Sequence, residues 1–251
     1  MYRQILAQEP NHPDALHLLG VVALQSGQQD AALQLIQRAI ALRPGDAQYQ
    51  NNLGNVLLSK GSFADAEAVF RRVLENHPAY AEAHYNLGLA LHRQGRIELA
   101  MVAYRHALGL KPEYADAWHN LGNVLLLQGQ LEPAAAAFRS ALRLKPQSAE
   151  LHYNLGNALL DQGLWKEAVA VFSTAIELRP DYAEAFYNQG IALHNQHEFG
   201  AAESAYRTAI ALRPDYVEAH CNLGKALLDE RQIQPALDAF QVASIPPRRM
   251  D

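Results

Sequence analysis

The 251-residue sequence has a single cysteine, Cys221, and no long apolar segment. One cysteine excludes an intrachain disulfide framework and a cysteine-rich metal site. The longest apolar runs are four to six residues, as in 133–138, whereas a membrane-spanning helix needs about 20. The N-terminus lacks the hydrophobic core of a signal peptide. We therefore expect a soluble protein of a reducing compartment, the cytoplasm, with no membrane partner.

Basic residues are also scarce, because Lys and Arg number 21 against 26 Asp and Glu, for a net charge of -5. A nucleic-acid-binding surface usually needs a clustered excess of basic residues, so we expect no nucleic-acid partner. The sequence has no Walker loop, dinucleotide-binding glycine pattern, calcium loop or nucleophile elbow. The protein is therefore expected to be no enzyme and to need no cofactor.

Glycine and proline, in contrast, recur with a fixed period of 34 residues and without any insertion or deletion. A fixed period of this size indicates a repeat architecture. The periodic glycines are Gly20, Gly54, Gly88, Gly122, Gly156, Gly190 and Gly224. The periodic prolines are Pro10, Pro44, Pro78, Pro112, Pro146, Pro180 and Pro214.

Seven repeats follow if the periodic glycine is numbered position 8 and the later proline position 32. Their bounds are 13–46, 47–80, 81–114, 115–148, 149–182, 183–216 and 217–250. Residues 1–12 align with positions 23–34 and are interpreted as the second-helix remnant of a preceding repeat.

Each repeat is predicted to form two helices. Positions 4, 7, 8 and 11 lie on one face of the first helix, and positions 17, 20, 24, 27 and 28 on one face of the second. Position 20 is always alanine, and position 24 is large and mostly aromatic. Glycine at position 15 in five repeats suits a left-handed cap between the helices, and proline at position 32 ends the repeat. Because neither helix can bury its apolar face alone, the repeats must stack.

These features resemble the tetratricopeptide repeat (TPR), whose period is 34 residues. Residues of repeat 4 that match the family pattern are Trp118, Leu121, Gly122, Leu125, Ala134, Phe138 and Pro146. The resemblance implies an all-α, right-handed superhelical α-solenoid of tandem helix-turn-helix repeats, with the first helices along a concave groove. It implies protein binding without identifying the partner.

Asparagine occupies position 6, on the predicted groove side, in six consecutive repeats. These residues are Asn52, Asn86, Asn120, Asn154, Asn188 and Asn222, joined at position 9 by Asn55, Asn123 and Asn157. Asparagine is about 0.5 to 0.7 kcal/mol less favourable in a helix than alanine, so the repetition calls for a reason. An amide can pair with both the C=O and N–H of a peptide, which favours binding of an extended segment. Hydrogen bonds between repeats, or recent duplication, are the alternatives, although duplication fits poorly with the free variation at position 13.

An asparagine ladder within TPR repeats resembles the substrate-binding arm of protein O-GlcNAc transferases and related bacterial proteins. The resemblance rests on segments such as 85–88 and 118–125. It implies that the ladder holds protein substrates while a separate glycosyltransferase domain, for which this sequence has no strand-helix region, performs the chemistry.

Another TPR use, the clamp for a C-terminal carboxylate, requires basic residues at positions 2, 5 and 6. Position 2 is acidic in six of the seven repeats, which disfavours such a clamp. The acids also suit the positive end of the first-helix dipole. Position 5 contains Tyr85, Tyr153 and Tyr187, which are candidate contacts for a bound segment.

Histidines offer little evidence for a metal site. His84, His152 and His220 share position 4, and we expect them to be half-buried rather than metal ligands. His194 and His197 with Glu198 form the one tight cluster, but they lack a histidine-glutamate helix motif. We therefore predict no metal.

Repeat 6 is the weakest match, with Gln189, His197 and Gly200 at consensus positions. In addition, the last eight residues lose the pattern and no capping helix is evident. The chain could thus adjoin a missing domain or associate end to end.

Taken together, the residues favour a non-catalytic scaffold that binds an extended protein or peptide in its groove. The alternatives are the recognition arm of a truncated or split O-GlcNAc-transferase-like enzyme, and a purely structural array.

Overall fold

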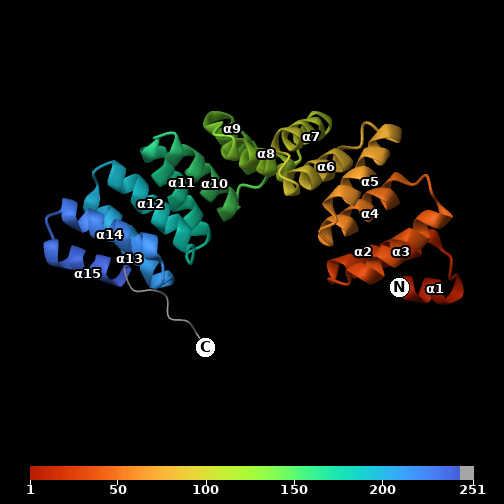
Figure 1. The fold of residues 1–251 in the computed structure, drawn as a ribbon, viewed down its shortest axis with the longest axis horizontal. Coiled ribbons are helices and arrows are strands. Elements are labelled where there is room, and N and C mark those ends of the chain that lie inside the picture. Colours follow the sequence, from red (N-terminus) through yellow and green to blue (C-terminus); the bar gives the residue numbers. More distant parts are fainter. Residues whose placement is uncertain (244–251) are drawn as a thin grey trace. The chain divides into compact units, whose positions relative to one another are not determined.

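A computed structural model describes residues 1–243 of the chain (Figure 1), which form fifteen α-helices and no strand. In chain order these are α1 Tyr2–Gln8, α2 Pro13–Gln25, α3 Gln29–Leu42, α4 Ala47–Ser59, α5 Phe63–Asn76, α6 Ala81–Arg93, α7 Ile97–Leu110, α8 Ala115–Leu127, α9 Leu131–Leu144, α10 Ala149–Asp161, α11 Trp165–Leu178, α12 Ala183–Asn195, α13 Phe199–Leu212, α14 Val217–Asp229 and α15 Ile233–Ala243. The arrangement is an all-α solenoid of helix-turn-helix repeats, as the sequence predicts. The eight residues after 243, where the repeat pattern is lost, lie outside the described residues.

Each repeat pairs a first helix at positions 1–13 with a second helix that begins at position 17. In repeats 1 to 6 the second helix ends at position 30, two residues before the periodic proline, whereas repeat 7 has Arg248 at the proline position and its second helix is α15, Ile233–Ala243. The residue before the proline lies outside the helical region, with φ -136° at Arg43 and -138° at Lys111. A residue that precedes proline is pushed out of the helical region by the proline ring. The proline thus ends the second helix in repeats 1 to 6.

The turn between the two helices uses the left-handed backbone region at position 15. All five glycines at this position have φ between 68° and 77° (Gly27, Gly61, Gly95, Gly129 and Gly163). This confirms the expected left-handed cap. Repeats 6 and 7 adopt the same conformation without glycine, with φ 63° at His197 and 62° at Arg231, where a side chain is strained.

The core of each repeat is the contact between the side chain at position 24 and the glycine at position 8. A Cβ atom added to Gly54 would lie 2.4 Å from the Phe70 ring, and one added to Gly156 would lie 2.5 Å from the Phe172 ring. The alanine at position 20 is 0% exposed in all seven repeats. Glycine at position 8 therefore makes room for a side-chain ring, and not simply for a neighbouring helix backbone.

The buried face of the first helix is wider than the pattern 4, 7, 8, 11 predicts. In repeats 2 to 7, positions 3 and 10 are buried, as at Ala83 and Ala117, and position 4 is half-buried. In repeat 1, Leu16 at position 4 is buried and Val22 at position 10 is exposed. The first helix contacts the second helices before and after it and also neighbouring first helices. Contacts on several sides bury residues that a single amphipathic face does not include.

The described helices belong to two compact parts, Met1–Val124 and Leu125–Asp251. In the first part, α1 packs on α2, and Leu6 contacts the cluster of Leu16, Ala39 and Tyr49. In the second part, Leu193, Tyr206, Leu223 and Leu227 belong to one buried cluster that spans α12 to α15.

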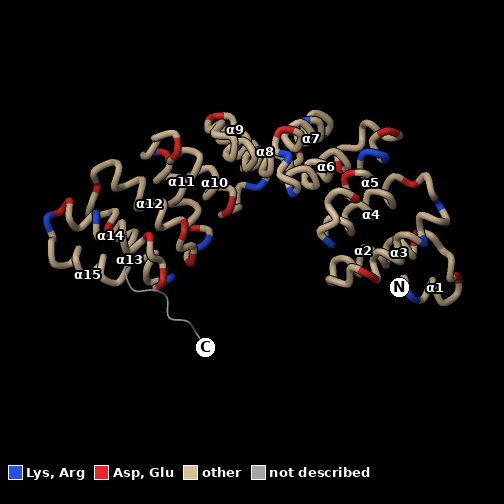
Figure 2. The backbone as a smooth tube through the Cα atoms, viewed as in Figure 1, with Lys and Arg blue, Asp and Glu red and all other residues tan. Residues whose placement is uncertain are grey.

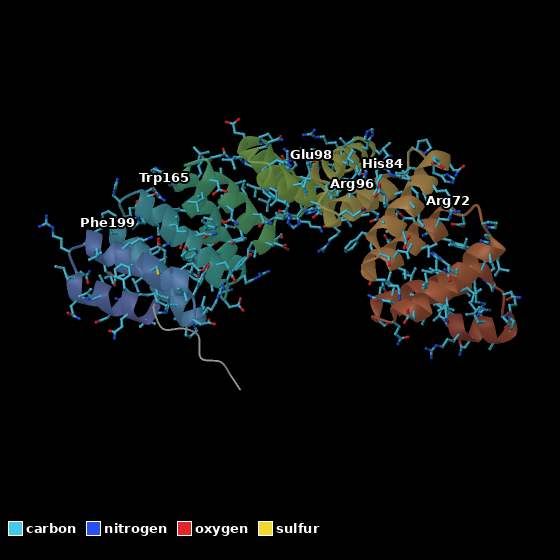
Figure 3. The ribbon with its side chains drawn as sticks, in the orientation of Figure 1. Arg72, His84, Arg96, Glu98, Trp165 and Phe199 are labelled. Carbon is cyan, nitrogen blue, oxygen red and sulfur yellow. The ribbon has the colours of Figure 1, made fainter. Side chains whose placement is uncertain are left out.

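A buried carboxylate joins repeats 2 and 3. Glu67 accepts hydrogen bonds from Gln94 Nε2 at 2.9 Å, from Arg71 Nε at 2.9 Å and from Arg96 Nη1 at 2.6 Å. Arg96 extends from the turn that precedes α7 (Figure 3). Burial alone would raise the pKa of Glu67, but the hydrogen bonds from Gln94 and Arg71 outweigh it and the pKa is lowered. The cluster is satisfied internally and offers no free group for chemistry.

The strained turns of the last two repeats give a stability prediction. Arg231→Gly should raise the free energy of unfolding by about 0.5 to 1 kcal/mol, because glycine removes the Cβ strain at φ 62° but carries a larger chain-entropy cost. Gly129→Ala should lower it by a similar amount, because it introduces that strain. Urea unfolding followed by circular dichroism measures both.

A matched control is Gly109→Ala, a substitution within α7 where a Cβ has open space. It should stabilise by about 0.5 to 1 kcal/mol through helix propensity alone. If Arg231→Gly destabilises while Gly109→Ala stabilises, the strain at position 15 has been assigned wrongly.

Candidate functional site

In five repeats, the side-chain amide of the asparagine at position 6 donates to position 5 of the preceding repeat. Asn86 Nδ2 donates to Asn51 Oδ1 at 3.1 Å, and Asn120 Nδ2 donates to Tyr85 Oη at 3.0 Å. The same bond is made at 2.7 Å between Asn52 Nδ2 and His17 Nε2, at 3.3 Å between Asn188 Nδ2 and Tyr153 Oη, and at 3.0 Å between Asn222 Nδ2 and Tyr187 Oη. We call the six position-6 residues, from Asn52 to Asn222, the asparagine ladder.

These bonds support the interpretation that the ladder joins neighbouring repeats. Each uses one of the three hydrogen-bonding groups of the amide, which are two N–H donors and one carbonyl oxygen. Asn86 is buried at 8% exposure, and Asn52, Asn120, Asn154, Asn188 and Asn222 are half-buried. The ladder therefore retains hydrogen-bonding groups at an accessible surface.

The asparagines at position 9 lie beside the ladder. Asn55 Nδ2 donates to Asn52 Oδ1 at 3.3 Å, and Asn157 Oδ1 accepts from Asn188 Nδ2 at 2.7 Å. Asn123 is half-buried at the same position of repeat 4. The structure thus joins Asn55 to Asn52 in the first part, and Asn157 to Asn188 in the second.

The three tyrosines at position 5 are half-buried and held between two other rings. Tyr85 packs on Tyr104 and Tyr114 with ring centroids 6.0 and 4.7 Å apart. Tyr153 and Tyr187 make the equivalent contacts in their own repeats. Burial raises the pKa of Tyr85 to about 12, so its hydroxyl stays protonated. These rings position the ladder amides through their hydroxyl groups.

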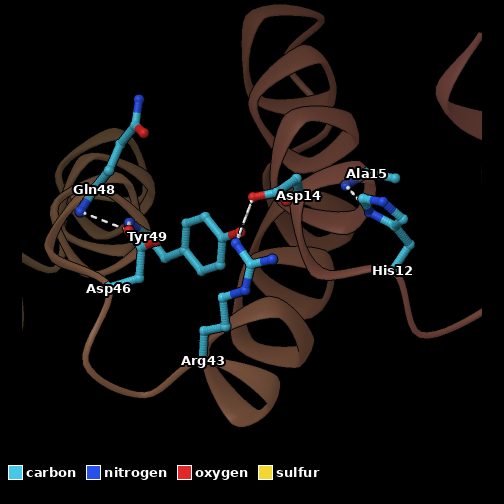
Figure 4. A network of polar contacts seen from close by, with 7 residues as sticks. All are labelled: His12, Asp14, Ala15, Arg43, Asp46, Gln48 and Tyr49. Atoms are coloured by element: carbon cyan, nitrogen blue, oxygen red, sulfur yellow. Dashed lines mark hydrogen bonds and ion pairs between the residues drawn. The ribbon is translucent and has the colours of Figure 1, made fainter.

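In repeats 1, 3 and 6 the acid at position 2 is paired with a basic residue at position 31 of the same repeat. Asp14 is 2.9 Å from Arg43 Nη1, Glu82 is 2.8 Å from Lys111 Nζ, and Glu184 pairs with Arg213. Figure 4 shows the first of these, where Tyr49 also donates to Asp14. The hydrogen bond from Tyr49 lowers the pKa of Asp14, and Arg43 adds to the effect. These three acids therefore have ion-pair partners in addition to their favourable place at the helix N-terminus.

The same cations also cover the tyrosines at position 34. Lys111, Arg179 and Arg213 lie 4.8, 4.5 and 4.0 Å from the ring centroids of Tyr114, Tyr182 and Tyr216. Basic and acidic residues are interspersed along the chain in both parts (Figure 2). Lys111 and Arg213 each contact both an acid and a tyrosine ring.

The histidines at position 4 bond to the chain of the preceding repeat. His84, His152 and His220 are half-buried, as expected, and their Nε2 atoms lie 2.9, 3.0 and 3.0 Å from the carbonyl oxygens of the preceding position-32 prolines. Trp118 Nε1 makes the same bond at 2.8 Å, and His84 is seen on α6 in Figure 3. These side chains connect consecutive repeats.

His194 and His197 do not form a shared site with Glu198. His194 Nε2 lies 2.8 Å from Asp229 Oδ2, and His197 occupies the left-handed turn. Within residues 1–243, no group of three potential ligands is placed to hold a metal ion. No helix in that range is both long and apolar enough to cross a membrane.

Sequence reasoning missed a small cavity between α12 and α14. Its lining is Ile191, His194, Tyr206, Asn222 and Lys225. A signal for it exists in the sequence, because only repeats 3 and 6 have tyrosine at position 24, and the same two repeats alone have histidine at position 12. Comparison of each repeat with the others would have identified these residues.

Tetratricopeptide repeat family models match residues 1–55, 51–115, 122–163, 156–197 and 198–229. Among solved structures, YrrB, described as a TPR protein with an unusual peptide-binding site, is 27% identical with a TM-score of 0.68, over 73% of this chain and 95% of that one. MamA is 25% identical with a TM-score of 0.61, over 62% and 92%.

The C-terminal part of a TPR repeat-containing protein from Cytophaga hutchinsonii has a TM-score of 0.74 at 15% identity, over 93% of this chain and 96% of that one. At this identity the likeness shows the fold alone. The comparison with curated proteins finds no match.

The bond between His17 and Asn52 gives a pH prediction. Asn52 Nδ2 donates, so His17 Nε2 must accept, and the ring must be neutral. Burial lowers the pKa of His17 below 6.5, against the opposing effect of Asp46 and Asp14. A pKa lowered by folding means that the stability contribution is complete above about pH 6.5 and is lost as the pH falls below it.

His17→Asn is the matched variant, because position 5 of the next repeat is Asn51 and bonds to its ladder amide without titrating. Wild type should lose more stability than His17→Asn between pH 7.5 and pH 5, measured by urea unfolding. Equal losses would show that His17 is not the titrating group.

Proposed function

The chain belongs to the tetratricopeptide repeat family, and on that basis we propose that it binds an extended segment of a partner protein along the asparagine ladder. The observation that carries this proposal is that the ladder amides of five repeats are oriented by a bond to position 5 and keep further hydrogen-bonding groups. A side chain already fixed in position loses less conformational entropy when it binds a ligand. The bonds between repeats and the binding of a segment are therefore compatible roles of one amide.

The spacing of the ladder favours recognition of the backbone. One amide per repeat recurs without regard to the changing residues at positions 9, 12 and 13. An amide pairs with the N–H and C=O groups that every peptide has, whereas the varied neighbours supply selectivity for side chains. The resemblance to YrrB, a TPR protein with a peptide-binding site, supports the same function.

The family also fits a non-catalytic role. Three acids at position 2, Asp14, Glu82 and Glu184, are engaged in ion pairs with basic residues of their own repeats. A carboxylate held in this way is not poised as a general base. Binding, rather than chemistry, is the function that this surface supports.

A random 12-residue peptide library displayed on phage provides ligands for the test. Peptides selected on the full chain should bind the triple variant Asn120→Ala, Asn188→Ala, Asn222→Ala at least tenfold more weakly than wild type, measured by fluorescence anisotropy. A tenfold loss corresponds to about 1.4 kcal/mol. N-methylation of alternate peptide bonds should weaken binding to wild type, because it removes the backbone donors.

The control is Asn76→Ala, which removes an amide from the end of a second helix, where Asn76 bonds to the carbonyl of Arg72 at 3.1 Å. It should leave the affinity unchanged. Circular dichroism establishes that each variant is folded at the assay temperature. Undiminished binding by a folded triple variant would contradict the role of the ladder.

The uninterrupted run of six ladder asparagines supports a narrower second candidate, the substrate-recognition arm of an O-GlcNAc-transferase-like glycosyltransferase. In that case the bound segment would be a substrate that a separate catalytic domain modifies. Coding sequence for a two-lobed glycosyltransferase domain joined to this chain, or in the adjacent gene, would favour the arm. A different type of domain at that place would exclude it.

A further inference from the structure

The cavity between α12 and α14 lies beside the ladder and is of a size for one side chain. Its volume is about 180 Å³, and its walls are Ile191 and His194 of α12, Tyr206 of α13, and Asn222 and Lys225 of α14. Cofactor and drug-sized ligand sites usually occupy about 300 to 1,000 Å³. The cavity is therefore suited to a group that projects from a segment bound along the ladder.

Hydrogen-bond donors dominate this cavity. Lys225 Nζ donates to Asn222 Oδ1 at 3.0 Å, and Asn222 Nδ2 donates to Tyr187 Oη at 3.0 Å. These bonds occupy the amide oxygen and one amide N–H, so the second amide N–H and two of the three ammonium N–H groups remain. The groups left for a ligand at Asn222 and Lys225 are therefore mainly donors.

Tyr206 adds another donor to the wall of the cavity. The residue is 1% exposed. Burial raises the pKa of Tyr206, which keeps the hydroxyl protonated. A ligand that accepts hydrogen bonds can therefore bond to it.

Lys225 supplies a positive charge at the cavity. Lys225 is exposed, and no carboxylate among residues 1–243 is within ion-pair distance of its ammonium group. The neighbouring acid, Asp229, is 2.8 Å from His194 Nε2 and is thus already engaged. An accepting ligand that carries a negative charge would be paired with Lys225 at close range.

Repeats 3 and 4 contain the same histidine, tyrosine and asparagine, but have leucine in place of Ile191 and asparagine in place of Lys225. The equivalent positions are Leu89, His92, Tyr104, Asn120 and Asn123. The Tyr104 hydroxyl is buried and has no hydrogen-bond partner in the described part of the chain. A tyrosine hydroxyl is thus present both in repeats 3 and 4 and at the cavity of repeats 6 and 7, whereas the lysine is found at the cavity of repeats 6 and 7 alone.

We propose that the cavity of Ile191, His194, Tyr206, Asn222 and Lys225 receives the carboxylate of an aspartate or glutamate side chain. Lys225 pairs with the charge, and the hydroxyl of Tyr206 and the free N–H of Asn222 donate to the carboxylate oxygens. That the carboxylate belongs to a segment bound along the ladder rests on the proposed function. The partner segment then carries an acidic residue at the place that meets repeats 6 and 7.

The probes for the test are N-acetyl-glutamate N-methylamide and its uncharged counterpart, N-acetyl-glutamine N-methylamide. Titration of the ¹⁵N-labelled full chain should give saturable shifts of the Asn222 side-chain amide signals with the glutamate probe. The glutamine probe should bind at least fivefold more weakly. Equal binding of the two probes, or shifts that leave Asn222 unaffected, would overturn the proposal.

Two variants test which residues cause the preference for the glutamate probe over the glutamine probe. Both install residues that other repeats of this chain have at the same position. Lys225→Asn installs the residue found at position 9 of three other repeats, and Tyr206→Phe installs the residue found at position 24 of four. Lys225→Asn should abolish the preference for glutamate, and Tyr206→Phe should weaken binding of both probes at least twofold. The control Lys166→Met removes an exposed lysine from α11 and should change neither. A preference for glutamate retained by Lys225→Asn would overturn the assignment.

The experiments distinguish failure of the cavity proposal from failure of the proposal that the ladder binds a peptide. Selected peptides that bind wild type and lose affinity in the triple asparagine variant, but show no difference between glutamate and glutamine, would contradict the cavity proposal alone. Probe binding at Asn222 together with peptide affinity unchanged in the triple variant would contradict the ladder alone.

Discussion

The contact on which the rest of the structure depends is the packing of the position-24 side chain against the glycine at position 8. In the repeats where it is described, a Cβ at that glycine would lie 2.4 to 2.7 Å from the opposing side chain. The contact fixes how closely the two helices of a repeat approach and how the first helix is rotated. With positions 3, 7, 8 and 10 turned inward in most repeats, position 6 lies at the edge of the buried face and positions 5 and 9 lie further round the helix. The site is thus a consequence of where the ring sits.

A polar layer follows from this packing. Each ladder asparagine costs about 0.5 to 0.7 kcal/mol in helix propensity, while a hydrogen bond contributes about 1 kcal/mol. The bond to position 5 is therefore of the size needed to offset the propensity cost. The same bond orients the amide for a ligand. One asparagine side chain can therefore both connect two repeats and contact a bound segment. The ion pairs between positions 2 and 31 leave the ladder surface with few unpaired charges, and Lys225 is notable for that reason.

Much of the fold could be predicted from the sequence because it depends on local rules. Proline at position 32 ends a helix through its own ring, and glycine at position 15 permits a left-handed turn, so Pro44 and Gly61 indicate their structures directly. The inward role of position 3 and the half-buried state of position 4 could not be read from one amphipathic stripe, since each first helix has neighbours on several sides. The left-handed turns at His197 and Arg231 could not be predicted either, because there the packing of the helix pair overrides the backbone preference of the residue.

The sequence by itself determined the period, the helix pairs and the row of asparagines, because these depend on spacing along the chain and on local backbone preference. Only the tertiary structure decided what each asparagine touches, since its partner lies 35 residues earlier, as with Asn120 and Tyr85. The same holds for the cavity, where Ile191, Tyr206 and Lys225 come from three helices. Hydrogen-bond geometry and enclosed volume are properties of side chains brought together by packing, and no periodicity along the chain specifies them.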